Sequence, residues 1–207
     1  MAGMKRKRVV GTARSVPATN GMPERLAASA LKLFSERGIN AVSVDDIAAD
    51  AKVTKGSLYW HYDSKDALIK AACTHYYRGY HRRINSELAH ITNPVKRLER
   101  TLDAAVGTCL VDRKNRIFTT EIFNLAAHDE ELRRSWQQFF DQVREFYVSL
   151  VKAATGLSMK EAERRADLLL SAMEGLKLRA QYEPHLCILG CKKAIVNDLK
   201  RVALLAE

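Results

Sequence analysis

Apolar residues recur along most of the chain at intervals of three and four, which is the spacing of one face of an α-helix. The first such stripe follows Pro23, a residue suited to the first turn of a helix, and it runs from Leu26 to Phe34. Gly38 is expected to end this helix, because glycine tolerates the left-handed backbone that commonly closes a helix. No stretch alternates apolar and polar residues convincingly, as a half-buried strand does. The pattern predicts an all-α fold.

Two short helices are predicted next. Ser43 stands before the first of them and Asp46 lies three residues further on, which is a carboxylate variant of the capping box. A tight turn is expected at Lys52 and Val53, and Thr54 is placed to cap the second short helix, from residue 55 to about residue 61. Two short capped helices separated by about three residues predict a helix-turn-helix.

Longer helices account for the rest of the pattern. A fourth helix restarts near residues 63–66 and runs past Tyr80, and further helices are predicted at about 94–112, 116–127, 129–155, 159–182 and 187–205. No segment repeats at a fixed period. We expect a basic arm at 1–22, disordered in isolation, a helix-turn-helix unit at 23–70 and a larger helical unit at 71–207.

Charge is concentrated at the start of the chain. The 207 residues carry 34 Lys and Arg against 24 Asp and Glu, a net charge of +10, which favours an anionic partner such as nucleic acid. Residues 1–22 hold five basic residues and no acidic one, whereas residues 23–68 hold six basic and seven acidic residues. The arm is either a solvated tail or a flexible segment held to DNA phosphates. With no membrane-length apolar run, no secretory leader and only four cysteines, we expect a cytoplasmic protein with no membrane partner.

The second short helix of the helix-turn-helix carries an unusual mixture of hydroxyl, basic and aromatic side chains. A buried helix would not interleave aromatic residues with Lys55 and His61, whereas a helix that enters a DNA groove uses such groups on phosphates and base edges. Gly56 allows a close approach of the backbone. The alternative is a helical hairpin with one solvated face.

Residues 23–70 closely resemble the DNA-binding domain of the TetR family of bacterial transcriptional regulators. The resemblance rests on three stretches with the family's spacing: Ala28, Leu31, Leu33, Phe34 and Gly38; Val44, Ile47, Ala48, Ala51 and Val53; and Thr54, Lys55, Gly56, Ser57, Leu58, Tyr59, His61, Tyr62, Lys65 and Leu68. It implies a homodimer whose two recognition helices enter successive major grooves of a palindromic operator in double-stranded DNA.

The resemblance also assigns roles to residues. Positions expected to hold phosphates are Ser43, Thr54, Ser57, Tyr59, Trp60, His61 and Lys65, and those able to meet bases are Lys55, Gly56 and Tyr59. Asp45 lies where some relatives meet a base. It either accepts a hydrogen bond from cytosine or serves to cap the helix, and capping is favoured.

For the C-terminal unit the resemblance implies ligand binding by the helices within 94–155 and dimerisation by the last two helices. Apolar residues predict this homodimer contact in helix 161–182 and in the final helix, where they include Ile195, Val196, Leu199 and Val202. Inward residues of mixed character are candidates for a small-molecule inducer site, namely Cys109, Phe118, Glu121, Ile122, Phe139, Phe140, Val143, Tyr147, Met173 and Lys177. Each of them is also consistent with an ordinary core position. Glu121 and Lys177 are expected to pair with each other or with a polar ligand.

Other functions have weaker support. Phosphate loops, nucleophile elbows and zinc-protease motifs are absent, so we predict no enzyme activity, no cofactor and no metal site. Cys187 and Cys191 lie one helical turn apart, which suits a thiol or metal sensor but is more typical of core cysteines. The aromatic and histidine residues at 75–81 either bind a metal or pack across the junction between the units, and packing is favoured. The sequence therefore predicts a repressor released by an inducer, with an architectural DNA-binding protein as the alternative.

Overall fold

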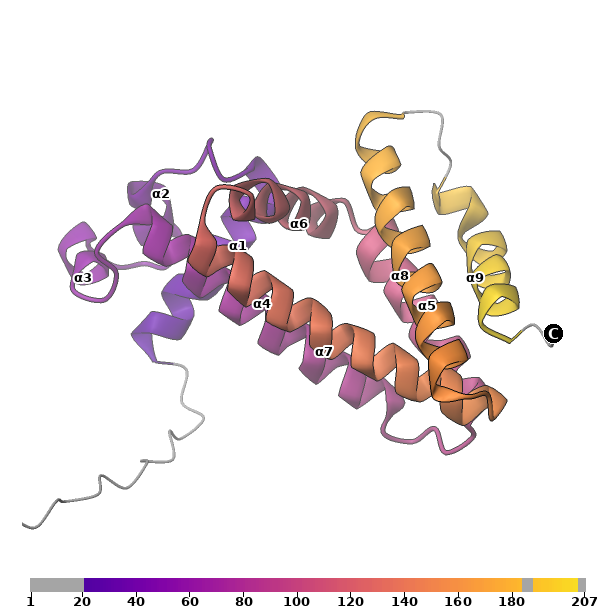
Figure 1. Cartoon of the computed structure of the whole chain (residues 1–207). Coiled ribbons are helices and arrows are strands. Elements are labelled where there is room, and N and C mark those ends of the chain that lie inside the picture. The colour runs from indigo at the N-terminus through magenta and orange to yellow at the C-terminus, as the bar shows by residue number, and fades with distance from the viewer. Residues whose placement is uncertain (1–20, 184–187, 205–207) are drawn as a thin grey trace, which may run out of the picture.

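The computed structural model describes residues 21–183 and 188–204, and every regular element in these residues is helical (Figure 1). The elements are α1 (Met22–Arg37), α2 (Val44–Asp50), α3 (Lys55–Tyr59), α4 (Lys65–Leu88), α5 (Pro94–Ala105), η1 (Val106–Val111), α6 (Arg113–Ala126), α7 (Glu130–Thr155), α8 (Met159–Tyr182) and α9 (Ile188–Leu204). The predicted all-α fold is confirmed. Nearly all of the expected basic arm, residues 1–20, lies outside the described residues, as does Cys187. No described helix is both long and apolar enough to cross a membrane.

Short polar side chains set where most helices begin. The expected caps are confirmed at Ser43, with a complete capping box to Asp46, and at Thr54, whose hydroxyl accepts from the backbone N–H of Ser57 at 3.1 Å. Asp112 caps α6, so that helix starts at residue 113 and not at 116 as expected. The predicted helix 94–112 is also interrupted. Its last six residues form a π-helical segment, η1, after α5 has ended.

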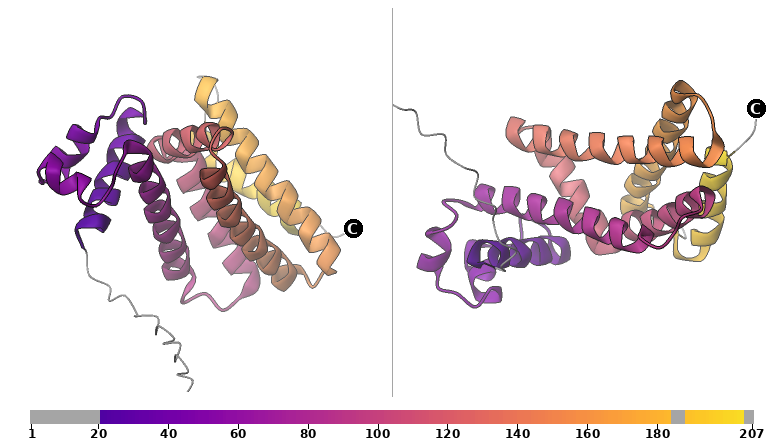
Figure 2. Two further views of the ribbon diagram at one scale, coloured as in Figure 1. Left: turned by 60° about the vertical axis from the view of Figure 1, so that its left-hand side comes forward. Right: turned by 90° about the horizontal axis from the view of Figure 1, so that it is seen from below.

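The N-terminal hydrophobic core joins the short helices to more distant parts of the chain. Phe34, Leu58 and Leu68 are each fully buried in it. Two fully buried residues of α6, Phe118 and Ile122, belong to the same cluster. Helix α6 therefore packs on α1, as the views in Figure 2 show, and the helix-turn-helix shares its core with the C-terminal unit.

Helices α4 and α7 overlap in Figure 1 but stand apart in the right-hand view of Figure 2, and aromatic side chains from both helices meet between them. Tyr77 of α4 stacks on Phe139 of α7 with ring centroids 4.5 Å apart, and Tyr76 and Tyr80 meet Phe139 edge to face. Packing across the junction, the favoured interpretation of this segment, agrees with these contacts.

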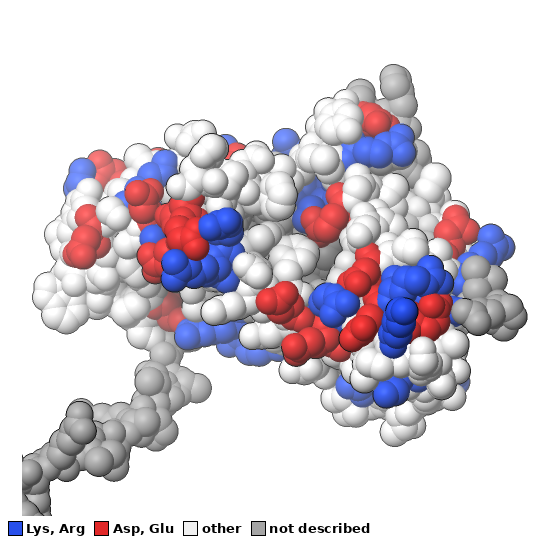
Figure 3. Space-filling view, in the orientation of Figure 1, with Lys and Arg blue, Asp and Glu red and all other residues white. Residues whose placement is uncertain are grey.

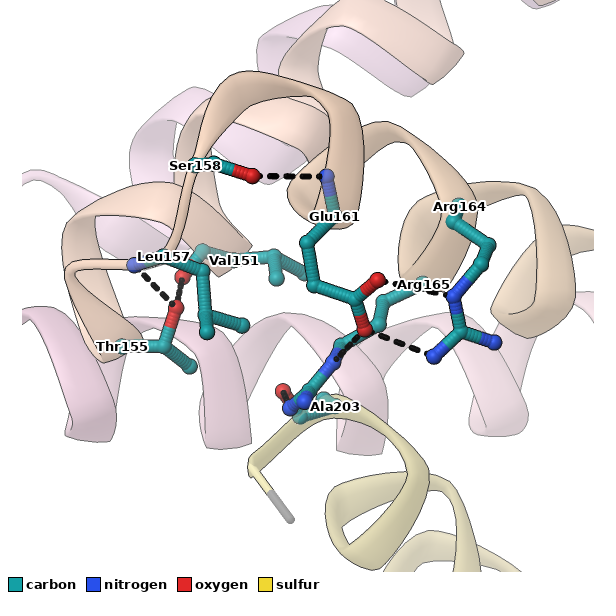
Figure 4. Close-up of polar contacts among 8 residues, drawn as sticks. All are labelled: Val151, Thr155, Leu157, Ser158, Glu161, Arg164, Arg165 and Ala203. Carbon is teal, nitrogen blue, oxygen red and sulfur yellow. Dashed lines mark hydrogen bonds and ion pairs between the residues drawn. The ribbon is translucent and has the colours of Figure 1, made fainter. Parts of the chain in front are cut away.

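Helix α9 is attached to the first turns of α8 by a largely buried polar network (Figure 4). Arg165 is only 4% exposed; it donates to Glu161 at 2.8 Å and to the carbonyl oxygen of Ala203 at 3.1 Å. Val196 and Leu199 are buried against the same domain, and Ile195 and Val202 pack partly buried against its core. Val196 and Leu199 are therefore covered by their own domain, whereas Ile195 and Val202 are only partly buried, and the contact through the last two helices stays a prediction.

Candidate DNA interface and C-terminal cavity

The turn between α2 and α3 is held by local backbone hydrogen bonds. Val53 N–H donates to the carbonyl of Ala48 at 2.9 Å, and Lys52 takes a positive φ of 55° that lets the chain reverse. Two hydrogen bonds between residues far apart in sequence fix the two sides of α3 to α1. Before α3, Arg25 donates to the carbonyl of Ala51 at 2.7 Å, and after it the Tyr62 hydroxyl donates to the carbonyl of Pro23 at 3.0 Å. The short helix α3 is thus presented in one orientation.

One side of α3 is buried and the rest is open. Leu58 is fully buried, whereas Tyr59 is 42% exposed and Trp60 is 82% exposed. Large exposed aromatics are unusual on a soluble protein and commonly mark a contact surface. The remaining predicted DNA contacts are exposed or half-buried around the same helix, namely Ser43, Thr54, Lys55, Gly56, Ser57, His61 and Lys65.

Asp45 makes a contact that differs from the favoured expectation. The capping box is made by Asp46, which accepts from the backbone N–H of Ser43 at 2.8 Å. Asp45 lies in the first turn of α2 and pairs with Lys55 of α3 at 3.0 Å. This contact raises the pKa of Lys55, through its hydrogen bond to the Asp45 carboxylate, and it holds an amine beside the open face of α3.

Acidic and basic side chains alternate over the face of the helix-turn-helix shown in Figure 3. This agrees with the near-zero charge of residues 23–68, six basic against seven acidic. A uniformly basic surface is therefore not what brings this unit to DNA. Contacts placed at particular positions have to do so.

A small cavity lies in the C-terminal bundle where α4, α5, η1, α6, α7 and α8 meet. Its volume is about 40 Å³. Seven of the predicted ligand residues line it, namely Cys109, Phe139, Phe140, Val143, Tyr147, Met173 and Lys177. Sequence analysis did not place Tyr76, Tyr80, Asn115, Thr119, Trp136 or Glu174 here, although they line it too.

Two polar groups at this cavity are left without partners. Tyr147 is fully buried and its hydroxyl makes no hydrogen bond within the described part of the chain. Asn115 donates from Nδ2 to the Tyr76 hydroxyl at 3.1 Å, but its Oδ1 accepts none from the described residues. Such groups are uncommon in folded proteins, because a buried polar atom without a partner destabilises the fold.

The cavity interior is uncharged near neutral pH. Burial raises the pKa of the Tyr147 and Tyr76 hydroxyls well above their usual value and raises that of the Cys109 thiol to about 11. Charge enters only at the edge, where the amine of Lys177 pairs with the carboxylate of Glu174.

An apolar groove adjoins the cavity on the outside. Its volume is about 410 Å³, and α6, α7 and α8 form its walls. It shares five lining residues with the cavity: Thr119, Trp136, Phe140, Glu174 and Lys177. The exposed side chains of Phe123 and Leu178, 64% and 54% exposed, also border it.

Three predicted ligand residues, Phe118, Glu121 and Ile122, lie elsewhere, and Ile122 is fully buried in the N-terminal core. Phe118 is fully buried in the N-terminal core and borders a different groove, beside α1. Glu121 faces the end of α1, where its carboxylate accepts from the backbone N–H of Ile39 at 2.5 Å, immediately after Gly38. The expected Glu121–Lys177 pair is not formed, because Lys177 pairs with Glu174 on its own helix.

The residues of α4 considered for a metal site make other contacts. His75 contacts Glu24 of α1 through Nδ1 at 2.9 Å, which ties α4 to α1. Within the described ranges, no three metal-ligating side chains come together. Cys191 is an exposed free thiol on α9, so the core position favoured for it is wrong.

The residues missed at the cavity share a recognisable pattern. Tyr76 and Tyr80 lie four residues apart on α4 and therefore on one face, and Asn115 follows the Asp112 cap by less than one turn. Helical spacing could have grouped the two tyrosines. Nothing in their spacing indicates that Asn115 and Trp136 face the same space.

Comparisons with known proteins agree with this architecture. The family model described as bacterial regulatory proteins, tetR family, matches residues 26–72. The repressor DhaR of Mycobacterium sp. (strain GP1) is 28% identical over 170 residues, which is 77% of this chain and 82% of DhaR. The biofilm operon negative regulator IcaR of Staphylococcus epidermidis is 34% identical over 59 residues, only 27% of this chain and 32% of IcaR.

Solved structures extend the likeness over most of the chain. A TetR-like transcriptional regulator from Rhodococcus sp. RHA1 superposes with a TM-score of 0.61 at 25% identity, covering 91% of this chain and 96% of that one. A protein from Saccharomonospora viridis, solved in complex with choline, gives a TM-score of 0.74 at 18% identity over 85% and 93% of the two chains. At that identity the second likeness shows the fold alone.

Proposed function

Since this chain belongs to the TetR family and is a DNA-binding transcriptional regulator, we propose that it is a homodimeric repressor that a small molecule releases from a palindromic operator. The observation that carries the DNA-binding part is the open face of α3. Hydrogen bonds from α1 hold the segments before and after α3, and the helix exposes Tyr59 and Trp60, which a buried helix would cover.

Operator recognition is tested by replacing Tyr59 with alanine. We expect Tyr59→Ala to weaken operator binding by about 1–3 kcal/mol, because one base or phosphate contact is lost. Dimerisation should not change, since Tyr59 lies on the helix-turn-helix. His128→Ala, an exposed change after α6, is the control and should bind DNA normally. Equal operator binding by the Tyr59 variant would mean that α3 does not read the operator.

The proposed dimer contact is the outward face of α8. Leu168, Gly175, Leu178 and Tyr182 are exposed and follow one another three, four or seven residues apart, as on one side of a helix. A stripe of apolar and small residues lets two helices approach closely. Because Val196 and Leu199 of α9 are buried within their own domain, α8 supplies much of the apolar surface in this proposal.

Sedimentation velocity tests this dimer. Leu168→Asp should shift the protein from dimer to monomer, because it places a charge in the apolar contact. Leu125→Asp, at an exposed leucine of α6, is the matched control and should remain dimeric. A dimer that is unaffected by Leu168→Asp would place the contact on another face.

Helix α6 offers a route from the ligand to the DNA-binding unit. Thr119, Thr120 and Phe123 of α6 form one wall of the apolar groove, and Glu121 of the same helix holds the backbone of Ile39 after α1. Lys114, in the first turn of α6, also pairs with Glu36 of α1 at 2.7 Å. A ligand that displaces α6 would therefore move the end of α1, and hence the spacing between the two recognition helices of a dimer.

The alternative, an architectural DNA-binding protein, is tested by the distribution of binding sites. The purified protein would be incubated with sheared genomic DNA of its own organism at two salt concentrations, and the bound fragments sequenced. A few palindromic sites that persist at the higher salt would support a specific repressor. Hundreds of loosely related sites would support the architectural alternative.

A further inference from the structure

The inner cavity is too small for a ring-sized molecule. Its volume is about 40 Å³, whereas an apolar protein cavity that binds benzene measures about 150 Å³. The adjoining groove measures about 410 Å³, and the side chains that line both spaces separate it from the cavity. The body of a ligand therefore fits the groove, and only a head group of a few atoms reaches the cavity.

The unpartnered polar atoms in the cavity specify what this head group must offer. Asn115 Oδ1 can only accept a hydrogen bond, so the head group has to donate one. The Tyr147 hydroxyl can donate or accept, and it has no partner within the described residues. A hydroxyl group fits both, because it is donor and acceptor at once. Filling these two positions removes the cost of burying them unpaired.

The charges around the cavity argue against an ionised head group. The only ionised side chains in its lining are Lys177 and Glu174, and they neutralise each other at the edge. A cation or an anion that entered the cavity would lose its water, and it would find no unpaired charge of opposite sign in the lining.

We propose that the effector is a small uncharged molecule whose aromatic or aliphatic body lies in the groove between α6, α7 and α8, and whose hydroxyl group passes the Lys177–Glu174 pair to reach Tyr147 and Asn115. This rests on the proposed function, since it names the class of molecule that releases the repressor. Binding enlarges the 40 Å³ cavity, and α6, one of its walls, also contacts the DNA-binding unit.

Trp136 provides a direct readout of this binding. The chain has two tryptophans, Trp60 and Trp136, so Trp60→Phe leaves a single emitter in the wall shared by the groove and the cavity. In this background we would titrate benzyl alcohol, toluene, benzoate and benzyltrimethylammonium, which share one ring and differ in their head group. Benzyl alcohol should change the tryptophan emission up to a saturating concentration. It should bind at least about fivefold tighter than the other three compounds, which corresponds to roughly one net hydrogen bond.

Tyr147→Phe then tests the predicted hydroxyl contact. It should weaken benzyl alcohol binding about five- to tenfold and leave toluene binding unchanged, because it removes one oxygen and keeps the ring. Retained toluene binding also shows that the variant is folded. Asn115→Leu should produce the same selective loss, and Ser86→Ala, at an exposed position of α4 that lines neither the cavity nor the groove, is the control that should change neither affinity.

Several outcomes would overturn the proposal. These are equal affinities for benzyl alcohol and toluene, tightest binding by benzyltrimethylammonium or benzoate, or no effect of Tyr147→Phe and Asn115→Leu on benzyl alcohol. The titration contains no DNA, so it is independent of repression. Benzyl alcohol that binds as described but leaves the operator complex intact would uphold the ligand class and reject release by this ligand.

Discussion

The helix-turn-helix and the C-terminal bundle build their sites in opposite ways. In the helix-turn-helix, nearly all candidate contacts come from fewer than twenty-five consecutive residues, and they stand at the surface around a five-residue helix. In the bundle, the cavity lies inside, and six separate elements line it. A surface that recognises DNA can be built from neighbours in sequence, whereas an enclosed space for a small molecule has to be assembled from distant segments.

Helix α6 is one place where the two regions meet, and the contact there combines a local feature with a distant one. The local feature is Gly38, which ends α1 with a positive φ of 84°. The distant one is Glu121, which lies 82 residues after Ile39 and accepts a hydrogen bond from its backbone N–H. The predicted left-handed end of α1 is confirmed in φ, although its ψ of 153° lies outside the left-handed helical region. Substitutions in the two regions should separate local from distant contributions to the stability of the fold.

The largest effect is expected where α3 meets the core. Leu58→Ala should lower the free energy of unfolding by about 2–5 kcal/mol, because it truncates the only buried side chain of that helix and leaves a cavity in the core. The adjacent Tyr59→Ala should leave stability within about 0.5–1 kcal/mol. Urea denaturation followed by circular dichroism measures both. Equal losses would mean that Tyr59 supports the fold and is not free to contact DNA.

A medium effect is expected at the junction. Gly156→Ala should cost about 1 kcal/mol, because alanine is strained at φ 73° and the position is otherwise open. Gly38→Ala should cost about 2 kcal/mol, because its Cβ would lie 2.7 Å from the Glu121 carboxylate and would displace the hydrogen bond to Ile39. In a Glu121→Ala background the difference between the two glycine variants should shrink, and the backbone strain at φ 84° and ψ 153° should account for what is left. An unchanged difference would mean that the carboxylate does not contribute to the cost at Gly38.

A smaller effect is expected at the start of α2. Ser43→Ala should destabilise the protein by about 1 kcal/mol, because it removes the side-chain acceptor of the capping box. Ser86→Ala, at an exposed position inside α4, is the control and should be neutral or slightly stabilising. Thermal denaturation of the two variants compares them, and equal melting temperatures would count against the cap.

The smallest effect depends on pH and concerns the network of Figure 4. Hydrogen bonds from Arg164 and then Arg165 lower the pKa of Glu161 from 4.5 to about 2. A carboxylate with a lowered pKa stabilises the folded state above pH 4.5 and loses that contribution as the pH falls toward 2. The stability difference between wild type and Glu161→Gln should therefore shrink over that range. Glu163→Gln, on the same helix, controls for the loss of a charge, and a pH-independent difference for Glu161→Gln would contradict the assignment.

Much of the fold could be predicted from the sequence because its signals act within one helical turn. The caps at Ser43 and Thr54 and the stripe from Leu26 to Phe34 each involve residues three or four apart, and all were found where expected. The start of α6 was misplaced by three residues, because Asp112 was counted as part of the preceding helix and not as a cap.

The same distinction between local signals and distant packing applies to the candidate sites. Exposure of Tyr59 and Trp60 follows from their place around a short helix whose inward position is Leu58. The partners of charged residues do not follow from spacing. Glu121 and Lys177 were expected together, yet each found a nearer partner, at Ile39 and Glu174, because the pairing of charges depends on distances that only packing sets.

By itself, the sequence determined the helical fold, the order of its helices and the surface of α3, since apolar periodicity and capping act between near neighbours in the chain. Only the tertiary structure decided which aromatic rings enclose the cavity, which face of α9 is covered and where α6 contacts α1. These depend on how whole helices pack, and small differences in packing decide whether a given side chain faces a partner, a cavity or water.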